Sequence, residues 1–91
     1  MINKIIALEL TKARLNRLDT LLDDYLLQRI DAAAGELAHT GIVLTDDTND
    51  LMLVVDTVVW EYSNRDNQAG VPDWLRLRRR ERWLQQRKTN N

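Results

Sequence analysis

The side chains able to perform acid–base or metal chemistry in this 91-residue chain are 14 Asp/Glu and one histidine, and they form no recognisable catalytic or metal-binding motif. It has no cysteine, and its single histidine, His39, has no nearby motif that would supply partners for catalysis or metal binding. We interpret His39 as a cation at the end of a helix, where positive charge is favourable. Asp46, Asp47 and Asp50 lack the pattern of a calcium loop, so we interpret them as helix caps. We predict no enzymatic activity, no metal and no cofactor.

Asp56 interrupts an otherwise apolar segment, with LVV before it and TVVW after it. A carboxylate in apolar surroundings needs a cationic or hydrogen-bonding partner, or it holds a proton. No second acid, base or nucleophile lies beside it, so we favour a structural role over a catalytic one. We expect it to pair with an arginine of the last helix, in the same subunit or a neighbouring one.

The C-terminal segment PDWLRLRRRERWLQQR combines arginine with tryptophan. Residues 72–91 contain seven Lys/Arg and two Asp/Glu, whereas residues 1–71 contain six and twelve. The net charge of −1 therefore hides a basic end and an acidic remainder. This division suits head-to-tail contact between identical subunits and also docking on an anionic partner. Charge alone does not choose between them.

As a helix, the C-terminal segment would place Trp74, Leu77 and Leu84 on one side, which we expect to pack inward. Arginines and Trp83 would occupy the opposite side. Because Arg79, Trp83 and Arg87 are four residues apart, a guanidinium group can stack over the indole ring.

Three interpretations of this arginine side stay open: a solvated basic face, an interface with a subunit or partner, and contact with nucleic-acid phosphates. They can overlap in a ring that surrounds DNA. The candidate interface residues are Asp56, Trp60, Arg79, Trp83 and Arg87. The candidate phosphate contacts are Arg76, Arg78, Arg79, Arg80 and Arg82.

The elements that position these side chains are predicted to be helices. With three glycines and one proline, the chain has few of the turns that an all-β fold needs. Apolar periodicity predicts helices over residues 4–16, 20–38, 50–64 and 72–87, with residues 88–91 frayed. We expect one all-α domain over residues 1–91, a small bundle of about four helices with a long central helix. Its core would be modest, and oligomerisation would add burial.

Several local signals set the predicted boundaries. Thr20 and Asp23 resemble a capping box at the start of the second helix, and Gly41 is its expected stop. Pro72 suits the first turn of the last helix. The valine-rich third helix has the composition of one buried on more than one side. The N-terminal apolar run is brief and is broken by Glu9, which predicts a soluble cytoplasmic-type protein without a signal peptide or membrane span.

The order of these elements resembles a known family. The segments KARLNRL and DDYLLQRIDAAAGEL are followed by the acidic loop GIVLTDDTND, the apolar helix LMLVVDTVVWEYSNRD and a proline-led last helix. This order is similar to that of the small head–tail connector (adaptor, head-completion) proteins of tailed double-stranded DNA bacteriophages and prophages. The resemblance covers about residues 12–83, and WEYSNRDNQAGVPDWLRLRRRER is its most specific part.

The resemblance implies a compact helical bundle without catalytic activity. It implies a homo-oligomeric ring below the portal protein that extends the DNA channel and supports tail-side connector components. The expected location is the neck of the virion, after assembly in the host cytoplasm. The alternative that stays open is a small helical nucleic-acid-binding regulator or DNA-packaging accessory that uses the basic last helix. An antitoxin or another partner-bound helical protein is a further possibility.

Overall fold

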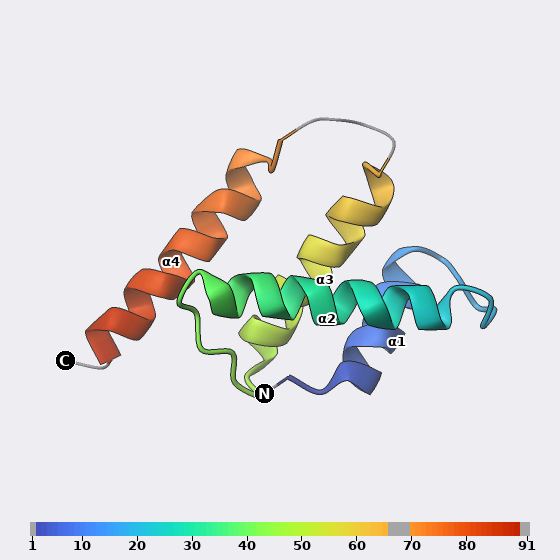
Figure 1. The fold of residues 1–91 in the computed structure, drawn as a ribbon, viewed down its shortest axis with the longest axis horizontal. Helices are drawn as coiled ribbons and strands as arrows, with labels where there is room; N and C mark the ends of the chain where they lie inside the picture. The colour runs from blue at the N-terminus through green and yellow to red at the C-terminus, as the bar shows by residue number, and fades with distance from the viewer. Residues whose placement is uncertain (1, 66–69, 90–91) are drawn as a thin grey trace.

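The computed structural model describes residues 2–65 and 70–89, and these form an all-α fold, as predicted. Its helices are α1 (Lys4–Arg14), α2 (Asp23–His39), α3 (Thr48–Ser63) and α4 (Asp73–Thr89). The molecule measures 45 × 28 × 18 Å. Figure 1 shows α2 lying across α3, with α1 toward one end of the long axis and α4 at the other. Within the part of the chain described, no helix is long and apolar enough to span a bilayer.

Helix α3 forms the centre of the core. All six residues from Leu53 to Val58 are buried. Because one helical turn takes about 3.6 residues, a buried run of this length means that α3 is covered on every side. Helices α1 and α2 pack on α3 and on each other, and α4 packs beside α3. The prediction that this helix is buried on more than one side is confirmed.

Helix α2 buries the predicted apolar stripe, including Leu26, Ile30 and Leu37, and it stops where predicted. Gly41 has a φ of 100°, a conformation that glycine adopts without strain. This turn lets the Gly41 N–H donate to the Ala38 carbonyl (3.0 Å) and the Ile42 N–H donate to the Leu37 carbonyl (3.1 Å). The last carbonyls of α2 are thereby satisfied.

The start of α2 differs from the prediction. The helix begins at Asp23, and its N-cap is Leu22, which makes no side-chain cap, so the predicted capping box of Thr20 and Asp23 is wrong. The Asp23 carboxylate instead lies 2.9 Å from Lys12 Nζ on α1. Attraction between these opposite charges directs Asp23 toward α1, away from the backbone of its own helix.

Side-chain caps begin the other two helices of the core. The Asn3 side chain accepts hydrogen bonds from the backbone N–H groups of Ile5 and Ile6 at the start of α1. Asp47 Oδ1 accepts one from the Asn49 N–H (2.7 Å) at the start of α3. The interpretation of Asp47 as a cap is confirmed, but that of Asp50 is wrong, because Asp50 lies inside α3 and its carboxylate pairs with Arg82. Helix α3 begins two residues before its predicted start.

Candidate interaction surface on the last helix

Helix α4 packs on the domain with the side opposite to the predicted one. Leu75 is its fully buried residue, at 0% exposure. Trp74, Leu77 and Leu84 are 48%, 57% and 41% exposed. The prediction that these three side chains pack inward is wrong, and they form an outward apolar row along α4, called here the α4 row.

Carboxylates of the domain explain this orientation. Asp50 and Asp56 are buried on α3 and therefore require cationic partners. Arg82 and Arg78 of α4 supply them. Apolar burial alone favours Trp74, Leu77 and Leu84 inside, but that arrangement would leave the two carboxylates without these partners. Arg78, Arg79 and Arg82 thus face the domain beside Leu75, whereas Arg76, Arg80 and Arg87 are exposed.

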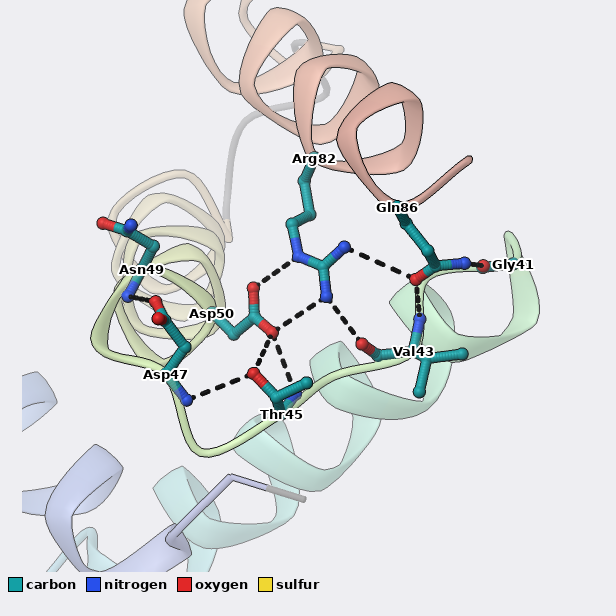
Figure 2. A network of polar contacts seen from close by, with 8 residues as sticks. All are labelled: Gly41, Val43, Thr45, Asp47, Asn49, Asp50, Arg82 and Gln86. Carbon is teal, nitrogen blue, oxygen red and sulfur yellow. Dashed lines mark hydrogen bonds and ion pairs between the residues drawn. The ribbon is translucent and has the colours of Figure 1, made fainter. Parts of the chain in front are cut away.

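The pair of Asp50 and Arg82 is the best-satisfied contact of this junction (Figure 2). Arg82 Nε lies 2.6 Å from Asp50 Oδ1, and Arg82 Nη2 lies 3.0 Å from Oδ2. The same nitrogen donates to the Val43 carbonyl (2.7 Å). The backbone N–H and the hydroxyl of Thr45 each donate to Asp50 Oδ2 at 2.8 Å. These bonds fix α4 to α3 and to the loop between α2 and α3.

Gln86, one turn after Arg82, adds two bonds to the same loop (Figure 2). Its Oε1 accepts from the Val43 N–H, and its Nε2 donates to the Gly41 carbonyl, both at 2.7 Å. An arginine and an amide from consecutive turns of α4 therefore form hydrogen bonds with the loop backbone. This arrangement sets the position of the C-terminal half of α4.

Electrostatics follow from these contacts. Burial raises the pKa of Asp50, but hydrogen bonds from Arg82 and Thr45 outweigh this, so the pKa lies below its usual value. The hydrogen bond to Asp50 raises the pKa of Arg82. Both groups stay charged at neutral pH. A carboxylate with a lowered pKa is a weak base, so Asp50 is poorly suited to activate the Thr45 hydroxyl as a nucleophile.

Asp56 joins three helices. Its two carboxylate oxygens contact Arg14 of α1 and Arg78 of α4. The predicted pairing with an arginine of the last helix is confirmed, and it lies within the chain. The second partner, Arg14, was not predicted, because its position at the end of α1 gives no indication of which helix it approaches.

The two candidate tryptophans are half-buried and pack on the core. A side chain at Gly41 would come within 3.3 Å of Trp83 Nε1, so this glycine gives the indole ring room at the end of α2. Arg87 lies over the Trp83 ring, 4.9 Å from its centre, and confirms the predicted stacking. Arg79 instead lies 3.6 Å from Glu36 of α2. Trp60 belongs to α3 and is not on the α4 row.

The predicted phosphate contacts separate into two groups. Arg78, Arg79 and Arg82 pair with carboxylates of the domain. Arg76 and Arg80 are exposed, and no ion pair joins either of them to another described residue. With Arg87 they follow one flank of the α4 row, at helix spacings of four and seven. The outer surface of α4 therefore combines an apolar row and a basic edge with two exposed acids, Asp73 and Glu81.

A surface recess of about 590 Å³ lies between α4 and the start of α3. Its charged lining includes Asp50 and Arg82, which are already bonded to each other. Among the residues that the structure describes, no group of three or more His, Cys, Asp or Glu side chains is placed to hold a metal ion. We therefore take the outer surface of α4, and not this recess, as the candidate functional site.

Sequence reasoning did not identify Asp50 and Gln86 as the residues that dock α4. A signal for the true inward side was present, since Leu75, Arg78, Arg82 and Gln86 follow the spacing of one helical face. It could be recognised only by allowing arginines to face the domain.

Comparisons with family models, with curated proteins and with solved structures find no match to this chain.

Proposed function

We propose that this chain is a non-enzymatic structural subunit that works by assembling with copies of itself and with other proteins. The observation that carries the proposal is the α4 row of Trp74, Leu77 and Leu84, which the fold turns outward although it is the most apolar side of the helix. Contiguous exposed apolar residues beside a polar rim are typical of protein interaction sites. Tryptophan and arginine are also the residues that contribute most to binding at such sites.

The specific assembly we propose is the head–tail connector of a tailed bacteriophage. The resemblance in helix order and in the arginine-rich ending supports it. In this role the chain would form a ring around the DNA channel, bind the portal protein on one side and meet tail-side components on the other. Its place would be the neck of the virion, after assembly in the host cytoplasm.

Nucleic-acid binding is the second candidate function, and the exposed Arg76 and Arg80 favour it. Phosphate contacts depend on arginines that are free to reach the backbone of the nucleic acid. Three of the five candidate arginines are held by carboxylates inside the fold, which leaves a narrow basic edge. An apolar row has no role in contacts with phosphates, so we favour the protein interface.

The test is light scattering on a sizing column, over a concentration series, at low and high salt and after nuclease treatment. We expect a discrete oligomer that survives nuclease and that appears as a closed ring in electron micrographs. The matched variants are Leu77→Gln in the α4 row and Ala32→Gln, which is exposed on α2. Leu77→Gln should weaken assembly, and Ala32→Gln should not. A monomer at every concentration that binds DNA in a salt-dependent way would instead establish the regulator.

A further inference from the structure

A second exposed apolar patch lies at the turn between α1 and α2. Leu18 and Leu21 are 96% and 83% exposed, and Tyr25 on the first turns of α2 is also exposed. Two acids, Asp19 and Asp24, lie among them and are exposed. We call these five residues the α1–α2 corner. Leucines this exposed bury almost nothing within their own chain, so the fold itself gives no reason for them.

We infer that the α4 row of one copy docks on the α1–α2 corner of the next copy. The inference rests on the proposed self-assembly and names the two surfaces that carry it. Each surface has an apolar centre: Leu77, Leu84 and Trp74 on one, Leu18 and Leu21 on the other. Contact between them removes both from water.

Charge favours this pairing. The edge of the α4 row is basic, through Arg76 and Arg80, and neither forms an ion pair with another described residue. On the corner, Asp19 lies 3.7 Å from Arg17, a long contact, and Asp24 has no ion pair within the described ranges. Arg80 and Asp24 are therefore free to pair across the contact, while Arg76, whose Nη2 donates to the Val71 carbonyl (3.0 Å), and Asp19 each have a partner within the chain. Opposite charges steer association and fix its register.

The positions of the two surfaces determine the type of assembly. Figure 1 shows the α1–α2 turn and α4 at opposite ends of the long axis, which is 45 Å. A contact between opposite ends of identical subunits is heterologous, and it gives a ring when the rotation per subunit closes. Because the two surfaces differ and lie at opposite ends, a contact between them is head-to-tail and is not a twofold dimer.

The chain contains no cysteine, so introduced thiols report contacts without background. The probes are single-cysteine variants Leu21→Cys in the corner and Leu77→Cys in the α4 row, treated with a short bismaleimide. The control is Ala32→Cys, exposed on α2 outside both surfaces. We expect the mixture of the Leu21→Cys and Leu77→Cys proteins to form cross-linked dimers several-fold faster than Leu77→Cys mixed with the control. The double variant should give a ladder of longer species, and high salt should slow both reactions.

The outcomes separate this inference from the proposed function. Cross-linking of the mixture at the control rate overturns the inference, and so does a Leu77→Cys protein that mainly cross-links to itself. If the unmodified protein is nevertheless a discrete oligomer, self-assembly stands and uses other surfaces. If cross-linking stays at the control rate and the unmodified protein is a monomer, both proposals fail. Fast, specific cross-linking supports the inference for an oligomer and equally for a monomer, where it reports a weak contact.

Discussion

The two sides of α4 have opposite chemistry, and each lies where simple amphipathicity would not place it. The inner side carries Arg78, Arg79 and Arg82, and each pairs with a carboxylate of the domain. The outer side carries the α4 row, all of it more than two-fifths exposed. Helix α4 is thus docked by three arginines together with Leu75 and Trp83, and it leaves the α4 row for other contacts. The lesson is that buried acids elsewhere in a chain decide which side of such a helix faces inward.

The first prediction compares Leu75 on the inner side with Leu77 on the outer side. Leu75→Ala should lower the free energy of unfolding by about 3 kcal/mol or more, because it removes a fully buried side chain and leaves a cavity. Leu77→Ala should leave this free energy nearly unchanged, since its side chain already contacts water. Urea unfolding followed by tryptophan fluorescence measures both. If both variants lose the same free energy of unfolding, Leu75 and Leu77 do not lie on a buried and an exposed side of α4.

The second prediction concerns the arginines. Arg82→Ala should lower the free energy of unfolding by about 2–3 kcal/mol, because it leaves the buried Asp50 carboxylate without its charged partner. Thr45 keeps its two bonds to that carboxylate and limits the loss. The matched variant is Arg80→Ala, two residues away on the exposed side, which should unfold like the unmodified protein. A large loss for Arg80→Ala would contradict this assignment of sides.

Asp56 gives a smaller effect, because both of its arginine partners are partly exposed. Asp56→Ala should destabilise the protein by about 1–2 kcal/mol, since it leaves two facing cations without a carboxylate. Asp56→Asn should cost less, because its amide oxygen still accepts one hydrogen bond. Thermal unfolding of the three proteins tests this order. If both variants melt like the unmodified protein, Asp56 has no part in joining α1, α3 and α4.

The smallest expected effect is a pH dependence of the contribution that Asp50 makes to the free energy of unfolding. The pKa of Asp50 is lowered in the folded protein, because the bonds from Arg82 and Thr45 outweigh the burial that raises it. The unfolded chain therefore binds the proton first as pH falls. The stabilisation is complete above the ordinary carboxyl pKa of about 4 and is lost as pH falls through the lower folded value.

The measurement is the difference in free energy of unfolding between the unmodified protein and Asp50→Asn. This difference should be constant from neutral pH down to about pH 4 and should shrink below it. Asp24→Asn is the control, because Asp24 is an exposed acid on α2, away from the Asp50 junction. A difference that grows as pH falls would reverse the sign of the Asp50 contribution.

Much of the helical architecture follows from local sequence. The apolar spacing of Leu26, Ile30 and Leu37 predicts the buried stripe of α2, and Gly41 predicts its end, because only a residue without a side chain adopts that turn easily. Apolar residues throughout LMLVVDTVV predict that α3 is buried on more than one side. The start of α2 was not predicted, because Asp23 pairs with Lys12 of a different helix and does not cap its own.

The sequence by itself determined that the protein is helical, where most helices lie and that Asp56 needs a cation. These properties depend on propensity, periodicity and the desolvation of single groups, which are local. Only the tertiary structure decided which side of α4 faces the domain. That choice depends on Asp50, Asp56 and Glu36, which lie on other helices, and on their distances from three arginines. Because pairing of charges requires proximity in space, the helical spacing shared by Leu75, Arg78 and Arg82 marks the inward side only once the facing carboxylates of other helices are placed.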